Sequence, residues 1–136
     1  MKLLTFYCDR FAYRTEAPTL AGVEAVDVDE AVEAAVVAWF QLEAGDEARL
    51  GKITTGAIKH LKWLARKWET RAIVLHSFAH LAETTAEPEA ARTFLANAAS
   101  RLTGAGYTVH QTAFGHTHRL EMVVPGPSMA KVFKSL

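Results

Sequence analysis

Residues Ala72 to His80 read AIVLHSFAH, and this stretch decides the fold class. Its first part, Ala72 to Leu75, is a short apolar run typical of a buried strand, and it passes directly into a loop that carries two histidines. Before it, apolar side chains recur at helical spacing between Asp46 and Glu69, and Pro88 begins a second helical pattern after it. A buried strand between two amphipathic helices predicts an α/β domain.

Working outward, the sequence predicts further strands on both sides of this unit. Asp46 is expected to cap the first long helix, and Ser128 to Phe133 is expected to form one or two helical turns. The predicted strands are Lys2 to Cys8, a second extended piece at Phe11 to Arg14, Val32 to Leu42, Tyr107 to Ala113 and Arg119 to Val124. No repeat or low-complexity segment divides the chain. We therefore expect one domain over residues 1–136, a sandwich of a mixed β-sheet with two main helices.

Composition narrows the class of protein. The chain has 136 residues, half of them apolar, which is enough for a sizeable core. Its single cysteine, Cys8, excludes a disulfide scaffold. The N-terminal apolar run is too short for a signal peptide because Asp9 and Arg10 interrupt it, and no apolar run has membrane length. We expect a reducing, cytoplasmic location.

The net charge is zero, but the charges are segregated along the chain. Residues 15–48 hold acidic side chains and no Lys or Arg, whereas residues 49–71 hold seven basic side chains and one acidic one, Glu69. A positive face suits an anionic partner such as RNA, although a merely solvated helix face explains the pattern equally well. The candidate RNA-binding residues are Lys52, Lys59, Lys62, Arg66 and Lys67.

Four of the six histidines, His76, His80, His116 and His118, lie in two loops expected at strand ends. Imidazole exchanges protons near neutral pH, donates hydrogen bonds and binds metals, so the set has several uses. One alternative is that the histidines are structural, and another is that the four hold a metal, although their spacing matches no specific zinc signature. Activation of Cys8 by a histidine is a weaker alternative, because a lone cysteine ending an apolar strand is usually a small buried side chain.

These loops carry a resemblance to a known family. The segment IVLHSFAHLAE, a helix, and then GYTVHQTAFGHTHRLEMVVPGPSMAK resemble the N-terminal editing domain of archaeal threonyl-tRNA synthetases, as does the opening KLLTFYCDRFAY. The resemblance spans essentially the whole chain, which looks like a free-standing version without the aminoacylation body. It implies a D-aminoacyl-tRNA deacylase-like fold and hydrolysis of the ester of mischarged seryl-tRNA(Thr).

The resemblance also implies site residues and departures from the family pattern. His118 stands where the family has a lysine important for hydrolysis, and Lys131 stands where it has an acidic residue. His118 and His80 would position water or polarise the ester, while main-chain N–H groups near Gly115 and the substrate's own 2′-OH would assist. The expected substrate-binding residues are Asp9, Phe78, Ala79, Phe114, Gly115, His116, Thr117 and Lys131.

The leading hypothesis is therefore a trans-editing aminoacyl-tRNA deacylase that needs no cofactor. We expect aminoacyl-tRNA, most readily tRNA(Thr), as its partner, with a threonyl-tRNA synthetase acting alongside it. A homodimer is expected, with the apolar segment Val32 to Leu42 as a candidate subunit contact. The alternatives are a non-catalytic module that binds a tRNA end or a nucleotide, and a hydrolase whose metal is held by His76, His80, His116 and His118.

Overall fold

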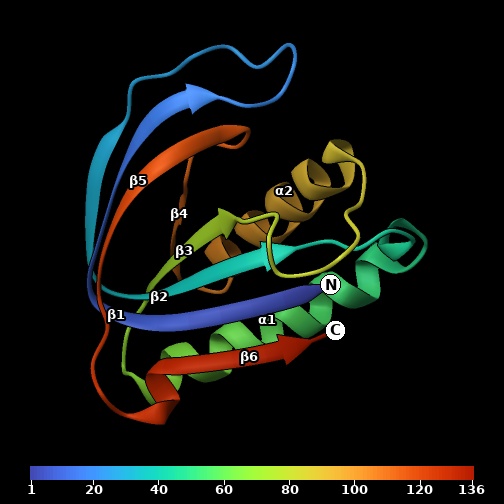
Figure 1. Ribbon diagram of the computed structural model, residues 1–136. Helices are drawn as coiled ribbons and strands as arrows, with labels where there is room; N and C mark the ends of the chain where they lie inside the picture. Colours follow the sequence, from blue (N-terminus) through green and yellow to red (C-terminus); the bar gives the residue numbers. More distant parts are fainter.

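A computed structural model describes residues 1–136, and Figure 1 shows a curved sheet with two helices packed on one face. The sheet has six strands in the order β4-β3-β2-β1-β5, and β6 pairs with β1 beyond this path. The strands are β1 (Lys2–Pro18), β2 (Asp29–Gln41), β3 (Ala72–Ser77), β4 (Thr108–Gln111), β5 (His116–Val123) and β6 (Lys131–Ser135). The helices are α1 (Leu50–Lys67) and α2 (Pro88–Gly104), with short 3-10 helices at Asp46–Arg49 and Ser128–Ala130.

Strand β1 is continuous, which corrects the prediction of a second extended piece at Phe11–Arg14. Its first part, Lys2–Phe6, pairs with β6, and its last part, Arg10–Pro18, pairs with β5, both antiparallel. Between them Asp9 and the facing Ala34 are unpaired, although the register is the same on both sides of this gap, and Ala34 has a φ of 48°. A non-glycine residue with positive φ breaks the extended backbone locally. The single long strand therefore turns a corner and lets the sheet curl, as Figure 1 shows.

The curl gives the sheet two separate cores. The first lies between the sheet and the helices, where Leu3, Phe40 and Leu75 meet Leu61 and Leu102. The second lies on the opposite face, where the far end of β1 and strand β5 fold over β2 and β3. Its members are Cys8, Phe11, Tyr13, Val32, Ala35, Val37 and Val74, with Leu120 and Met122 packed against them. Side chains of β2 alternate between these two cores, as the period of a strand requires.

Strand β2 confirms the predicted strand at Val32–Leu42 but corrects its predicted role as a subunit contact. It lies between β1 and β3 in the middle of the sheet. Val36, Val37 and Phe40 are buried within the chain itself. An interior strand with both faces covered has no surface left for a partner.

The helices follow the apolar pattern, although α1 begins differently from the prediction. Its apolar stripe, Ile53, Ala57, Leu61 and Leu64, is buried as expected. Asp46 caps neither α1 nor the 3-10 helix before it; its carboxylate accepts a hydrogen bond from Glu43 N–H and pairs with the Met1 amine at 2.7 Å. The segment Ser128–Phe133 forms one 3-10 turn and then joins β6.

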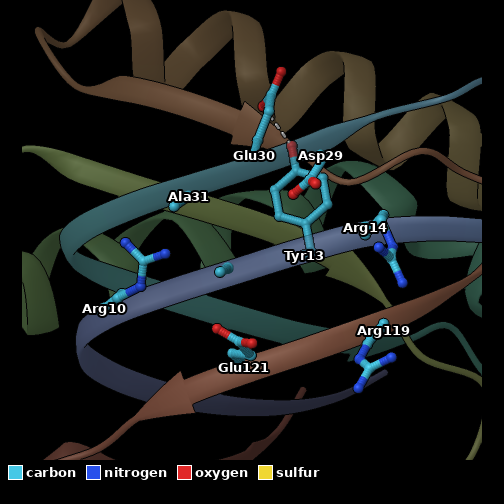
Figure 2. Close-up of a pocket in the computed structure, with 9 residues that line it drawn as sticks. Arg10, Tyr13, Arg14, Asp29, Glu30, Ala31, Arg119 and Glu121 are labelled. Carbon is cyan, nitrogen blue, oxygen red and sulfur yellow. Dashed lines mark hydrogen bonds between the residues drawn. The ribbon is translucent and has the colours of Figure 1, made fainter.

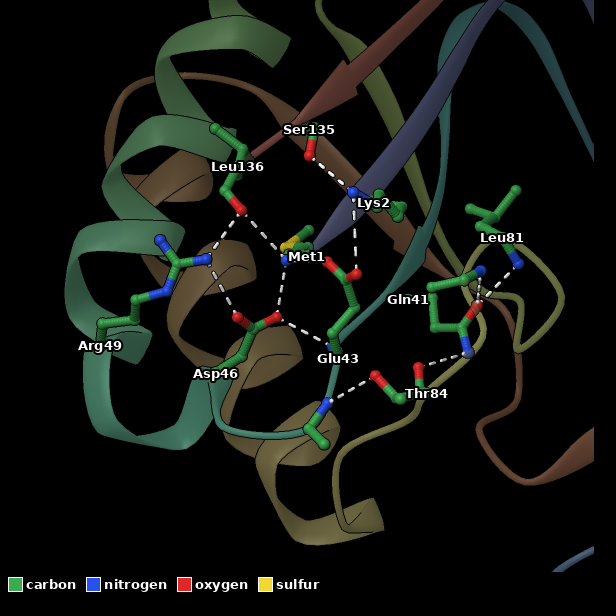
Figure 3. Close-up of polar contacts among 12 residues, drawn as sticks. Met1, Lys2, Gln41, Glu43, Asp46, Arg49, Leu81, Thr84, Ser135 and Leu136 are labelled. Carbon is green, nitrogen blue, oxygen red and sulfur yellow. Dashed lines mark hydrogen bonds and ion pairs between the residues drawn. The ribbon is translucent and has the colours of Figure 1, made fainter.

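A polar network joins the two termini of the described chain (Figure 3). The buried Met1 amine contacts the Glu43 carboxylate at 2.8 Å, and it donates to the Leu136 carbonyl at 3.1 Å. The amine holds the pKa of the Glu43 carboxyl below its usual value through their hydrogen bond. Nearby, Gln41 Oε1 accepts the N–H groups of Leu81 and Ala82, which ties the loop after β3 to the end of β2.

Neither helix combines the length and the hydropathy needed to cross a bilayer.

Candidate active site

Two of the predicted histidines meet although their strands are not neighbours in the sheet. His76 lies near the end of β3 and His118 near the start of β5, and their ring centroids are 5.4 Å apart with the rings at 72° to each other. Two strands, β2 and β1, separate β3 from β5. In a flat sheet those strands would be about 14 Å apart. The curl of the sheet thus creates the contact.

Aromatic side chains complete what we call the histidine cluster, namely Tyr13, Trp39, His76, Phe78 and His118. The Trp39 ring lies 5.6 Å from that of His76 and 4.5 Å from that of Phe78, and the Tyr13 ring lies 6.0 Å from that of His118. Sequence reasoning identified Phe78 but missed Tyr13 and Trp39. The register pairs Trp39 with His76 across β2 and β3, a signal that becomes readable once the strand order is known.

Burial keeps the two histidines uncharged near neutral pH. Desolvation, and after it the nearby His118, lower the pKa of His76 from 6.5 to about 4. Desolvation, and after it His116, lower the pKa of His118 as well. His76 is 4% exposed, and its Nδ1 lies 2.8 Å from the Thr112 hydroxyl oxygen. The cluster therefore presents neutral imidazoles, which accept protons, rather than imidazolium cations.

Two polar atoms in this cluster are buried and have no hydrogen-bond partner: Nε2 of His118 and Nε1 of Trp39. An unsatisfied buried polar group is costly, and most such groups in folded proteins have a partner. The indole N–H is a donor, and the neutral imidazole nitrogen is a donor or an acceptor according to its tautomer. Each of the two atoms marks a place where a polar ligand group or a water molecule would supply the missing partner.

The loop after β3 places the other predicted residues around this cluster. Phe78 N–H donates to Phe40 O at 2.9 Å, which fixes the first residue of the loop. The rings of Phe78 and His80 are 5.3 Å apart at 70°, while Ala79 and His80 are both exposed. His80 is therefore linked to the cluster through Phe78 and borders solvent.

His116 and Gly115 contact the β1–β2 connection, residues 19–28, which we call the flap. His116 Nε2 accepts the Val26 N–H at 3.3 Å, and its Nδ1 lies 3.2 Å from the Phe114 carbonyl oxygen. Gly115 has a φ of 75°, and a Cβ there would lie 3.1 Å from Val23 and 3.3 Å from Leu20. The flap thus fills the space beside Gly115, where the sequence predicted the substrate.

Four further predicted substrate-binding residues also lie outside the cluster. Phe114 packs under the Arg92 guanidinium, and Thr117 bonds the backbone of Ala17 on the outer side of β5. Lys131 Nζ donates to the carbonyls of Pro125 and Gly126. Asp9 is exposed in the corner of β1, two residues from Tyr7, whose ring stacks on Trp68 of the helical layer.

The alternative chemistries receive no support from the geometry. No three His, Cys, Asp or Glu side chains come together in an arrangement that could hold a metal, so His76, His80, His116 and His118 form no such group. Cys8 is fully buried in the second core, and desolvation raises the pKa of its thiol to about 12. A thiol that stays protonated is a poor nucleophile.

The predicted tRNA-binding side chains all lie on α1, away from the cluster. Lys52, Lys59, Arg66 and Lys67 are exposed and Lys62 is half-buried. A surface hollow of about 480 Å³ lies on the sheet, apart from these α1 side chains (Figure 2). Arg14 and Arg119 face each other there across β1 and β5. Asp29, Glu30 and Glu121 also line it, so its charge is mixed.

Comparisons with known proteins agree over the full length. Residues 1–136 match the family described as the archaea-specific editing domain of threonyl-tRNA synthetase. The chain is 26% identical to the threonine–tRNA ligase of Thermofilum pendens and 25% identical to that of Methanopyrus kandleri, covering 100% of this chain and 22% of each relative. It thus spans about a fifth of their length.

A solved structure, the c-Myc DNA Unwinding Element Binding Protein, superposes with a TM-score of 0.68 at 12% identity, over 100% of this chain and 99% of that one. At this identity the likeness speaks for the fold alone. It confirms the predicted α/β sandwich of the D-aminoacyl-tRNA deacylase type.

Proposed function

The chain belongs to the archaea-specific editing-domain family of threonyl-tRNA synthetase, and we propose that it hydrolyses mischarged aminoacyl-tRNA, first of all seryl-tRNA(Thr). The observation that carries the proposal is the unpartnered, buried Nε2 of His118 beside neutral His76. Serine is smaller than threonine, and a binding pocket rejects a smaller analogue by only about 1–3 kcal/mol, which is why such errors need hydrolytic correction.

His118 is proposed as the catalytic base. Its pKa is lowered, so near neutral pH the ring is neutral, and as the tautomer with a bare Nε2 it can take a proton from an attacking water. A protonated lysine, the family's residue at this position, cannot do so readily. In the step we propose, water oxygen bonds to the ester carbonyl carbon, the carbon–ribose oxygen bond breaks, and the proton taken by His118 passes to the departing ribose oxygen, which becomes a hydroxyl.

Trp39 Nε1 is proposed to hold the polar group that meets His118 Nε2. Both atoms are buried, and both rings lie against His76 at 5.6 and 5.4 Å. A fixed donor in a water-poor site stabilises developing negative charge better than water does. His80 is assigned a supporting role at the border with solvent, where its ring contacts that of Phe78.

Substrate entry is proposed to displace the flap. Of the two hollows on the surface, the one between α1 and β6 is lined by no residue of the histidine cluster and the other by Tyr13 alone, and the flap contacts Gly115. Two side chains hold it closed: His116 through Val26 N–H, and Thr15, whose hydroxyl bonds Val26 O at 2.8 Å and Val28 N–H at 2.9 Å. Few bonds hold a long exposed loop here, which favours local opening.

The proposed partners are tRNA(Thr) and a threonyl-tRNA synthetase that supplies the mischarged product in the cytoplasm. A homodimer is also proposed, in which the interior strand β2 takes no part in the contact. Sedimentation equilibrium tests this: the wild type is expected as a dimer, and a wild-type monomer contradicts it.

The experiment that tests the catalytic assignment is single-turnover deacylation of seryl-tRNA(Thr) by the wild type and by His118→Gln. Loss of a general base is expected to slow release by about 10²- to 10⁴-fold. His110→Gln is the matched control, because His110 lies on β4 outside the cluster and is expected to leave the rate unchanged. Equal rates for the wild type and His118→Gln would remove His118 from the mechanism.

A further inference from the structure

A second hollow, of about 630 Å³, lies between α1 and β6. We call it the α1–β6 groove, and none of its lining residues belongs to the histidine cluster. Strand β6 runs along α1 in Figure 1. The two elements approach closely because Gly56 has no side chain: a Cβ there would lie 2.9 Å from the Leu136 side chain.

The charged side chains of the groove have one sign. Lys59 lines it from α1 and Lys134 from β6, and no Asp or Glu lines it. Helix α1 contains no Asp or Glu at all. The positive surface continues beyond the groove, because Lys52 and Arg66 lie on the same helical stripe as Lys59 and span about 20 Å.

An exposed tryptophan lies within this positive surface. Trp63 is 36% exposed and lines the groove, with its ring 5.7 Å from that of His60. His60 is itself fixed, with Nε2 3.1 Å from the Thr5 hydroxyl. Trp68, by contrast, is stacked on Tyr7 at 4.1 Å. Trp63 therefore has an indole face open to a ligand.

We propose that the α1–β6 groove binds single-stranded RNA, with one base stacked on Trp63 and the flanking phosphates against Lys59 and Lys134. Aromatic faces between cationic side chains are the common means of binding single strands. A second copy of the chain fits less well, because a two-fold contact centred here would bring these lysines against their own copies. The inference rests on the proposed function in one respect, that the RNA is the tRNA substrate.

Binding of a labelled single-stranded oligouridylate of about eight nucleotides, compared with duplex RNA of the same length, tests the groove directly. Trp63→Leu is expected to weaken single-strand binding about tenfold, while Trp63→Phe, which keeps an aromatic face, retains most of it. Lys59→Gln and Lys134→Gln are each expected to reduce the slope of log affinity against log salt by about 0.7. Arg119→Gln, an exposed cation on β5, is the matched control.

Thermal unfolding checks that each variant is folded. Equal affinities for the wild type and Trp63→Leu, a preference for the duplex, or self-association that Trp63→Leu abolishes would each overturn the inference. The same variants distinguish failure of this inference from failure of the proposed function. RNA binding without hydrolysis of any aminoacyl ester supports the groove and contradicts the deacylase activity. Hydrolysis with a KM that Trp63→Leu does not change supports the deacylase activity and contradicts the groove.

Discussion

His76 and His118 stand ring to ring, 5.4 Å apart and nearly perpendicular, although two strands of the sheet separate the strands that carry them. The contact exists because β1 turns a corner near Asp9 and carries β5 over the far face of β2 and β3. Burial in this fold keeps both rings neutral. The proposed chemistry depends on that neutrality, so its most immediate consequences concern pH.

The first prediction concerns the acid limb of the pH–rate profile. The pKa of His118 lies below 6.5, so the neutral, active ring is present through neutral pH and is lost as pH falls below that value. We expect kcat/KM for deacylation to stay level near neutrality and to fall in acid with an apparent pKa below 6.5. A limb centred well above 6.5 would show that His118 is not the titrating base.

The second prediction concerns the unpaired indole nitrogen. Trp39→Phe keeps the aromatic packing and removes Nε1, so stability should change by less than about 1 kcal/mol. If Nε1 binds the substrate, KM or kcat should worsen by up to about tenfold, the value of one hydrogen bond. Trp68→Phe is the matched control: its Nε1 donates to Met129 O, so stability and not catalysis should suffer. Unchanged kinetics for Trp39→Phe would contradict the assignment.

The third prediction concerns stability in acid. The pKa of His76 is 6.5 unfolded and about 4 folded, so the unfolded chain binds this proton first as pH falls. The contribution of neutral His76 to the free energy of unfolding is complete above pH 6.5. It is lost progressively as pH falls to about 4, by roughly 3 kcal/mol in all.

His76→Gln keeps a polar partner for Thr112 and removes the titration. Urea unfolding at a series of pH values should therefore give a difference between wild type and variant that shrinks or reverses between pH 6.5 and 4. A difference independent of pH over that window would mean that His76 does not stay neutral in the fold.

The fourth prediction concerns the flap. His116→Phe removes the acceptor of Val26 N–H but leaves Thr15 bonded to Val28 N–H. Amide exchange at Val26 should become faster, while Val28 stays protected and serves as the internal control. Unchanged exchange at Val26 would show that His116 does not hold the flap.

The helices and strands were largely predictable from sequence, because apolar periodicity indicates the helices, β2 and β3 directly. The histidine cluster was predictable only in part. His76 and His118 stood out as polar residues at strand ends, but their contact depends on the corner in β1, where the unpaired Asp9 gives no clear sequence signal. Trp39 looked like an ordinary strand residue, because its role follows from its neighbours across the sheet and from the burial of a single atom.

The bend in β1 also limits how well sequence predicts the residues that lie outside the histidine cluster. Family resemblance carried Asp9 and Lys131 into the pocket by their order in the chain, whereas the structure leaves Asp9 exposed at the corner of β1 and engages Lys131 with the 125–126 turn. Linear order does not report which face of a bent strand a side chain occupies.

The most direct test of the central claim is release of amino acid from tRNA(Thr) charged in parallel with serine or threonine. We expect rapid release of serine and slow release of threonine by the wild type, with the serine reaction slowed by about 10²- to 10⁴-fold in His118→Gln. Release of neither amino acid by folded protein that still binds the charged tRNA would contradict it, and would favour a module that binds a tRNA end without hydrolysing the ester.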